Sequence, residues 1–295
     1  MQGDGMHLYP FCLPQGYCAV VAKLCSPAKT PRSPSRAVCI YLVGFHHSSY
    51  IASVVLPKKP LTARSAAFCL HGRRGFLYTG SMATDAERSV TQAGNPAKPT
   101  GAAGAEMLAR MNDSHAAVTE WGLALLPIAA DAAVLDIGCG GGATLHRLAM
   151  RAPQGRITGV DYSEVSVACS QEFNRADIAS GRMQVIQGSV ESLPFADNAF
   201  DIITTVESFY FWPAPQENLL EVCRVLKPGG RFLLIAEIHE DGSLPEQDRR
   251  NIELYHLFNP TRAEFEAMFR NAGFTEVQAH TKAGEHWIAV CGGKI

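Results

Sequence analysis

Residues 134–142 read VLDIGCGGG, an apolar run that ends in a glycine-rich loop. Gly138, Gly140 and Ala143 fit the spacing G-x-G-x-x-[GA], which holds a dinucleotide pyrophosphate at a helix N-terminus. Asp136 stands two residues before the first of these glycines. Its carboxylate would repel a pyrophosphate but would help to hold a cationic ligand, directly or through water. The loop therefore serves either a dinucleotide or a ligand that carries no phosphate at this point.

A second acid follows the next apolar run. Asp161 ends the stretch RITGVD, 21 residues after Gly140. Two hydroxyl donors can bond one carboxylate, so an acid there suits a ribose diol, which NAD would also offer. No G-K-[ST] follows the glycines, so a Walker-type phosphate site is excluded. S-adenosylmethionine, which has an ammonium, a sulfonium and a ribose but no phosphate, fits both acids, and Asp136 favours it over NAD.

These residues need a sheet to position them. Short apolar runs predict seven strands, at 133–138, 156–163, 183–189, 200–207, 230–238, 274–280 and 286–292. Helical spacing predicts helices over 105–126, 143–152, 163–179, 214–226 and 261–273. Alternating strands and helices indicate a doubly wound, Rossmann-like α/β fold with helices on both faces of the sheet. The last two strands are too close in sequence for a parallel crossover, so the seven-stranded, mostly parallel sheet has one antiparallel strand.

Four blocks carry a family resemblance: VLDIGCGGG, GVDYS, QGSVESLPFADNAFDII and RVLKPGGRFLLI. In order and spacing they resemble class I S-adenosylmethionine-dependent methyltransferases, in the branch with the ubiquinone/menaquinone-biosynthesis and sterol methyltransferases. The resemblance covers roughly 105–292. It implies methyl transfer from S-adenosylmethionine to a small-molecule acceptor by in-line displacement. The alternatives are a non-catalytic S-adenosylmethionine-binding protein and an NAD(P)-dependent oxidoreductase.

The resemblance also assigns the cofactor contacts. The residues expected to bind S-adenosylmethionine are Asp136, Gly138, Cys139, Gly140, Asp161, Tyr162, Ser163, Ser189, Val190 and Glu207. Asp136 and the glycines would approach the methionine part, Asp161 the ribose hydroxyls and Tyr162 the adenine. Many relatives place an Asp against the adenine amino group where this chain has Ser189-Val190-Glu191. The Val190 amide or the Ser189 hydroxyl would then replace that contact. Ser163 is also a plausible N-cap, and Cys139 is expected to be a small packing residue rather than a nucleophile.

Catalytic candidates follow from the reaction. The sulfide leaves as a neutral group, so a base is needed only if the acceptor must lose a proton. Glu207, in the stretch VESFYFWP, is the first candidate for that role, with His115 and Tyr210 beside it. Tyr210, Phe211 and Trp212 would form an aromatic wall that favours a cation. The alternatives are a structural role for Glu207, a capping or solvated His115 and ordinary core packing of the aromatic residues.

Further polar residues follow the fifth strand. Glu237, His239 and Asp241 could face the acceptor, and with Glu207 they could suggest a metal site. We expect no metal, because open loop ends often carry polar residues for solubility. The segment 244–260 is expected to be a substrate lid, with His256 facing the pocket.

The N-terminal part differs in composition. Residues 1–81 hold one acid, nine bases and five of the nine cysteines, without C-x-x-C pairs, whereas 82–295 hold 27 acids and 17 bases. We expect 1–81 to be a largely disordered, non-native upstream extension, 82–104 a polar lead-in loop and 105–295 the methyltransferase domain.

The acidic balance of residues 82–295 argues against a nucleic-acid substrate. The uncharged run 39–56 is at the lower length limit for a membrane span and has polar residues at its centre, so we expect no stable insertion. Cysteines expected to be buried thiols favour a cytoplasmic protein. Oligomeric state does not follow from the sequence.

Overall fold

The computed structural model describes residues 6–12, 18–24, 44–45 and 85–295, and the chain divides into two compact units, Met1–Leu77 and Tyr78–Ile295. The first unit contains an antiparallel sheet of β1 (Met6–Cys12), β2 (Cys18–Leu24) and β3 (Gly44–Phe45), in that order. We expected no regular element in this stretch. Pro10 obscures the strand pattern, but it lies in an edge strand, where a missing N–H is tolerated. The rest of the expected upstream extension, including most of the run 39–56, lies outside the described residues.

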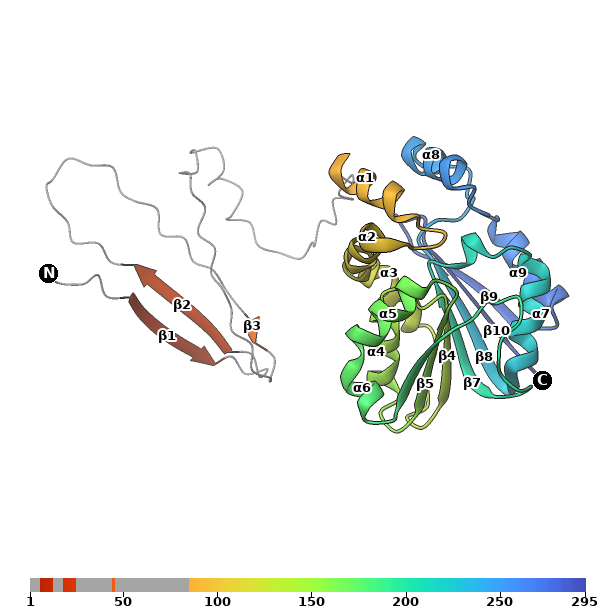
Figure 1. The fold of residues 1–295 in the computed structure, drawn as a ribbon, viewed down its shortest axis with the longest axis horizontal. Helices are drawn as coiled ribbons and strands as arrows, with labels where there is room; N and C mark the ends of the chain where they lie inside the picture. The colour runs from red at the N-terminus through yellow and green to blue at the C-terminus, as the bar shows by residue number, and fades with distance from the viewer. Residues whose placement is uncertain (1–5, 13–17, 25–43, 46–84) are drawn as a thin grey trace, which may run out of the picture. The chain divides into compact units, whose positions relative to one another are not determined.

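The second unit is built on the seven-stranded sheet that the sequence predicts (Figure 1). Only β10 runs against the others, pairing antiparallel with both β8 and β9, which confirms one reversed strand. The spatial order is β6 (Met183–Gln187), β5 (Arg156–Asp161), β4 (Ala133–Ile137), β7 (Phe200–Val206), β8 (Leu226–Ala236), β10 (Ile288–Gly293) and β9 (Thr275–Thr281).

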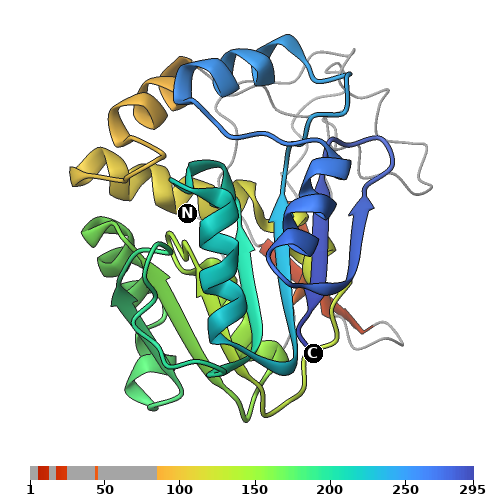
Figure 2. The ribbon, with the colours of Figure 1, turned by 90° about the vertical axis from the view of Figure 1, so that its right-hand side faces the viewer.

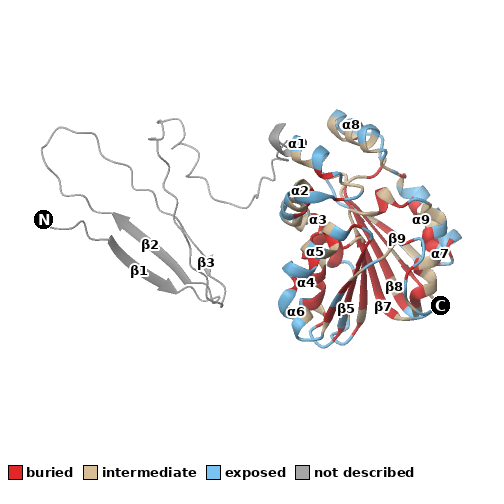
Figure 3. Cartoon of the chain, in the orientation of Figure 1, coloured by how far each residue is buried: buried red, intermediate tan, exposed pale blue. Residues whose placement is uncertain are grey.

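Helices cover both faces of this sheet. One face carries α3 (Ala116–Leu123), α4 (Ala143–Arg151), α5 (Glu164–Phe173) and α6 (Arg175–Ala179); the other carries α7 (Pro215–Val225) and α9 (Arg262–Asn271). Successive residues of β8 feed the two cores in turn: Leu233 packs toward α3 and α4, whereas Phe232 and Leu234 pack toward α7 and α9. The buried residues accordingly concentrate in the strands (Figure 3). These strands are therefore fixed on both faces, and their carboxyl ends can position side chains accurately.

The expected lead-in loop over 82–104 is wrong. It contains α1 (Asp85–Gly94), and α2 (Gly101–Ser114) begins before residue 105. The stretch is polar because α1 is a surface helix that packs on α2 with one face. One Gly ends this helix, and the other Gly and Pro residues follow it, so none of them interrupts it. The guanidinium of Arg110 on α2 donates a hydrogen bond to Thr91 Oγ1 of α1.

The expected helix over 163–179 is also interrupted. Asn174 separates α5 from α6, and its side-chain amide donates to the carbonyls of Gly142 and Ser170. Asn174 thereby ties α5 to the start of α4, next to the glycine-rich loop.

One more helix lies beyond the carboxyl ends of the strands. The segment expected as a lid contains α8 (Glu246–Tyr255), which lies beside α1 in both ribbon views (Figures 1 and 2). No helix in the described part of the chain is long and apolar enough to cross a bilayer.

Candidate functional site

A cavity of about 560 Å³ opens at the carboxyl ends of β4, β5, β7 and β8. This is within the range of small-molecule sites, roughly 300–1,000 Å³. We divide its lining into two parts. The glycine half comprises Pro96, Ala97, Pro99, Gly138, Cys139, Gly140, Asp161, Tyr162, Ser189 and Val190. The acidic half comprises His115, Glu207, Tyr210, Phe211, Trp212, Glu237, Asp248 and Tyr255.

The glycine loop turns sharply between β4 and α4. Gly138, Gly140 and Gly142 have φ of 72°, 51° and 86°, in the left-handed region that disfavours other residues. A Cβ at Gly138 would also stand 2.3 Å from the hydroxyl oxygen of Ser208. The amides of Gly138 and Cys139 both donate to the carbonyl of Val160 on β5, at 2.8 and 3.2 Å. The loop is therefore bound to the neighbouring strand, and its glycines are required by the backbone itself.

Asp161 ends β5 at the floor of the glycine half and is 7% exposed. Its carboxylate accepts the amide N–H of Gly140 at 3.0 Å and that of Ser163 at 2.9 Å. Burial raises the pKa of Asp161, and these hydrogen bonds oppose that shift. A carboxylate offers about four lone-pair positions, so roughly two remain for a ligand. The ribose contact expected of Asp161 stays a prediction.

A roof segment, residues 95–100 between α1 and α2, closes the glycine half from above. The hydroxyl of Tyr162 donates to the carbonyl of Ala97. The hydroxyl of Ser163 donates to the carbonyl of Pro99 at 2.6 Å and accepts the amide of Ser166, as an N-cap of α5. Tyr162 lines the cavity as expected, whereas Ser163 is fully buried and holds the roof instead.

Asp136 lies one layer behind the cavity rather than in its lining. It is 1% exposed, and one carboxyl oxygen accepts the hydroxyl of Thr204 on β7 at 2.6 Å. Burial, with a smaller contribution from the charge of Asp161, raises the pKa of Asp136 to about 7, although the Thr204 bond opposes the shift. Asp136 can therefore act on a ligand only from behind the lining, and its expected approach to the methionine part stays a prediction.

The remaining predicted cofactor residues of the glycine half do line the cavity. Ser189 and Val190 follow β6, and the Ser189 hydroxyl donates to the Glu191 carboxylate at 3.0 Å. Cys139 is 5% exposed, and burial raises the pKa of its thiol well above the usual range. Such a thiol stays protonated at neutral pH, in agreement with a packing role.

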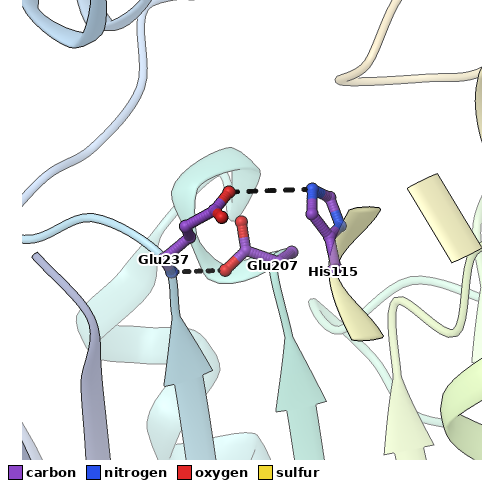
Figure 4. Close-up of side chains that lie close together, drawn as sticks. All are labelled: His115, Glu207 and Glu237. Carbon is purple, nitrogen blue, oxygen red and sulfur yellow. Dashed lines mark hydrogen bonds and ion pairs between the residues drawn. The ribbon is translucent and has the colours of Figure 1, made fainter. Parts of the chain in front are cut away.

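Three titratable side chains meet in the acidic half (Figure 4). Glu207 follows β7, Glu237 follows β8, and His115 separates α2 from α3. Their nearest ligand atoms all lie within 4.8 Å of one another, and His115 Nε2 is 4.0 Å from Glu237 Oε2. Glu207 has a φ of 55°, and its Oε1 accepts the backbone amide of Glu237. A left-handed glutamate costs about 1 kcal/mol or more, and such strain concentrates at functional sites.

The protonation of this cluster is unusual. Burial and the neighbouring charge of Glu237 raise the pKa of Glu207 well above its usual range. Burial, Asp248 and Glu285 raise the pKa of Glu237 to about 7. Burial and Arg110 lower the pKa of His115 to about 4. Near pH 7 the imidazole is therefore neutral, the surroundings of Glu207 favour its protonated form, and Glu237 has a pKa close to the pH.

The aromatic stretch both lines the cavity and packs into the core. Tyr210, Phe211 and Trp212 all border the acidic half, as expected. Trp212 also packs on Phe209, with ring centroids 4.9 Å apart. The Tyr210 hydroxyl accepts the amide of Ile238 at 3.2 Å and lies 3.4 Å from Glu207 Oε1. The wall is consequently held rigidly beside the glutamates.

Part of this chain is similar to known methyltransferases. A methyltransferase domain model matches residues 135–234. The chain is 30% identical over 154 residues to 2-methyl-6-phytyl-1,4-hydroquinone methyltransferase 1 of Oryza sativa subsp. japonica, covering 52% of this chain and 44% of that protein. It is 29% identical over 175 residues to the ubiquinone/menaquinone biosynthesis C-methyltransferase of Methylobacterium nodulans, covering 51% and 69%.

Residues 135–234 therefore resemble the methyltransferase domain family. A solved structure shares its fold: phosphoethanolamine N-methyltransferase 2 of Haemonchus contortus, with a TM-score of 0.57 at 14% identity, over 64% of this chain and 57% of that one. The chain spans less than half the length of several curated relatives, including 44% of the rice protein and 28% of a rice cycloartenol-C-24-methyltransferase.

Three residues that were expected to face the acceptor or the pocket do not line the cavity. His239 bonds through Nδ1 to the carbonyl of His286, and Asp241 bonds to the His286 ring at 2.6 Å. His256 ends α8 and is exposed, so it does not line the cavity.

Three residues that line the cavity were not predicted from the sequence. Asp248, Asn251 and Tyr255 line it from α8. Their spacing of three and four residues places them on one helix face. That spacing was a usable signal, but the segment was expected as a lid without a helical face.

Proposed function

We propose that this protein transfers a methyl group from S-adenosylmethionine to a small-molecule acceptor. The observation that supports this most is Asp161: a buried carboxylate, anchored by two amide N–H groups, with acceptor capacity left for a ribose diol. It lies beside a glycine loop at the carboxyl ends of adjacent parallel strands, where such folds bind nucleosides.

The charges of the cavity fit this cofactor better than a dinucleotide. Among the described residues that line it, Arg147 is the one cation, and its guanidinium already pairs with Glu120 at 3.0 Å. A pyrophosphate would find no free cation in this lining. The acids, with Asp136 behind the loop, instead favour a ligand that carries positive charge.

The residues of the two halves would have different tasks. When bound, S-adenosylmethionine supplies an electrophilic methyl group on a cationic sulfur. Asp161 holds the ribose, and Tyr162 borders the adenine. Glu207 and Glu237 face the acceptor, where the Glu237 carboxylate can take a proton from a nucleophile within hydrogen-bond reach. The aromatic wall excludes water and fixes the direction of approach, so positioning supplies much of the rate enhancement.

The proposal extends to the cellular setting. The described cysteines Cys139, Cys169, Cys223 and Cys291 are free thiols, which is typical of a reducing compartment such as the cytoplasm. The acidic cavity lining supports a small acceptor rather than a nucleic acid.

Calorimetric titration of the full chain tests the cofactor. We expect S-adenosylhomocysteine to bind with micromolar affinity and NAD not to bind. Binding of NAD alone would overturn the proposal. Formation of S-adenosylhomocysteine from S-adenosylmethionine, followed across a panel of acceptors, then tests transfer. Tight binding without turnover on any acceptor would indicate the non-catalytic alternative.

A further inference from the structure

We propose that the methyl acceptor is a primary amine, which binds as an ammonium ion among Glu207, Glu237 and His115. This inference rests on the proposed function and adds to it the chemical class of the acceptor.

The first support is the charge of the acidic half. Glu207, Glu237 and Asp248 all line it, whereas the lining cation Arg147 is paired with Glu120. The charge of Glu237 disfavours ionisation of Glu207, and the charges of Asp248 and Glu285 disfavour ionisation of Glu237. A cation placed between Glu207 and Glu237 would relieve this repulsion and favour the charged form of both groups. The half is therefore complementary to positive charge.

The second support is the spacing of the acceptor atoms. A primary ammonium has three N–H donors in tetrahedral directions, with N–H···O distances of about 2.8 Å, so its acceptors lie about 4.6 Å apart. The cluster offers three acceptors within 4.8 Å of one another, two of them 4.0 Å apart. The ligands of a divalent metal with bonds of about 2.1 Å lie only about 3.0–3.4 Å apart. The separation of 4.0 Å lies between these two spacings, so the cluster can hold an ammonium ion after only a small adjustment of its side chains.

The third support is the distribution of roles within the cluster. His115 has a pKa of about 4, so near pH 7 its Nε2 accepts a hydrogen bond without taking the proton. Glu237, with a pKa of about 7, can take it. Tyr210, Phe211 and Trp212, which line the same half, would cover the apolar part of the amine.

The reaction balances with these groups. The Glu237 carboxylate takes one proton from R–NH₃⁺, which leaves R–NH₂ and a neutral carboxyl. The nitrogen lone pair then forms the new N–C bond to the methyl carbon. The C–S bond breaks, its electron pair stays on sulfur, and the sulfide is neutral. The product R–NH₂⁺–CH₃ carries the charge, and no further reactant is required.

Binding measurements on the full chain test the inference. S-adenosylhomocysteine affinity is measured first, and separately, so that a failure of the cofactor proposal is recognised as such. The saturated protein is then titrated with butylamine, benzylamine and 2-phenylethylamine, and with the alcohols of the same three skeletons. Each titration is repeated with Glu237→Gln and with the control Glu253→Gln, which makes the same change on an exposed side chain of α8 outside the cavity.

We expect at least one amine to bind about ten-fold or more tightly than its alcohol, the magnitude of one charged hydrogen bond. Glu237→Gln should remove that preference and leave S-adenosylhomocysteine affinity unchanged, and Glu253→Gln should change neither. Equal binding of all three amines and their alcohols would overturn the inference. So would Mn²⁺ binding that Glu237→Gln abolishes, which would indicate a metal site. A loss of S-adenosylhomocysteine affinity in Glu237→Gln would instead assign the cluster to the cofactor.

Discussion

The buried carboxyl of Asp136 should make the stability of the second unit depend on pH. Its pKa is about 7 in the folded protein and close to the ordinary 3.8 in the unfolded chain. Because folding raises this pKa, the fold favours the protonated form. The stabilisation is complete below about pH 4 and is lost as the pH rises to about 7. A difference of about three units corresponds to about 4 kcal/mol in total.

Asp136→Asn isolates this effect. The amide oxygen can still accept the hydroxyl of Thr204, but the side chain can no longer ionise. Between pH 5 and pH 8 the wild-type protein should lose about 2–3 kcal/mol that the variant keeps.

Urea denaturation followed by tryptophan fluorescence measures this difference. The three tryptophans, Trp121, Trp212 and Trp287, all lie in the second unit, so the signal does not depend on the first. Asp131→Asn, at an exposed position, is the matched control and should run parallel to wild type. If Asp136→Asn also ran parallel to wild type over this pH range, the assignment of a buried carboxyl with a raised pKa would be refuted.

Three further predictions concern the loop, the cofactor and a helix cap. Gly138→Ala should destabilise the second unit by about 2–4 kcal/mol through its left-handed φ and its clash with Ser208. Adding Ser208→Gly should recover part of that loss in a double-mutant denaturation cycle, and strict additivity would contradict the clash. Asp161→Ala should weaken S-adenosylhomocysteine binding at least about 100-fold by calorimetry, since two charge-assisted hydrogen bonds are lost; a change below ten-fold would remove the ribose assignment. Thr261→Ala deletes the capping box of α9, formed with Glu264, and should cost about 1 kcal/mol in the same denaturation assay, with an unchanged midpoint counting against it.

The sheet could be predicted because its signals are local. The apolar run before Gly138 and the one that ends at Asp161 each predict a buried strand from about six residues. The link between β9 and β10 is too short for a parallel crossover, so it determines the direction of β10. The polar helix α1 gave no such signal. Its pattern was masked by the Gly and Pro residues that follow it, so 82–104 was expected to be a loop.

The site could be predicted only in parts. Glu207, His115 and Glu237 were each candidates, but their meeting point depends on three elements that are distant in the sequence. Asp136 was expected at the ligand because it precedes the glycines. It points instead toward Thr204, on the neighbouring strand β7, a pairing that appears only once the strand order is known. The hydrogen bond from the Ser163 hydroxyl to the carbonyl of Pro99 could not be predicted either, because the two residues are 64 positions apart in the sequence.

The roof segment is attached through the main chain. Tyr162 and Ser163 donate to the carbonyls of Ala97 and Pro99, groups that every residue possesses. Substitutions in the roof can therefore alter the entrance of the cavity without removing its anchors, whereas loss of either donor would release it. The sequence of residues 95–100 could consequently vary while Tyr162 and Ser163 still hold the segment over the glycine half of the cavity.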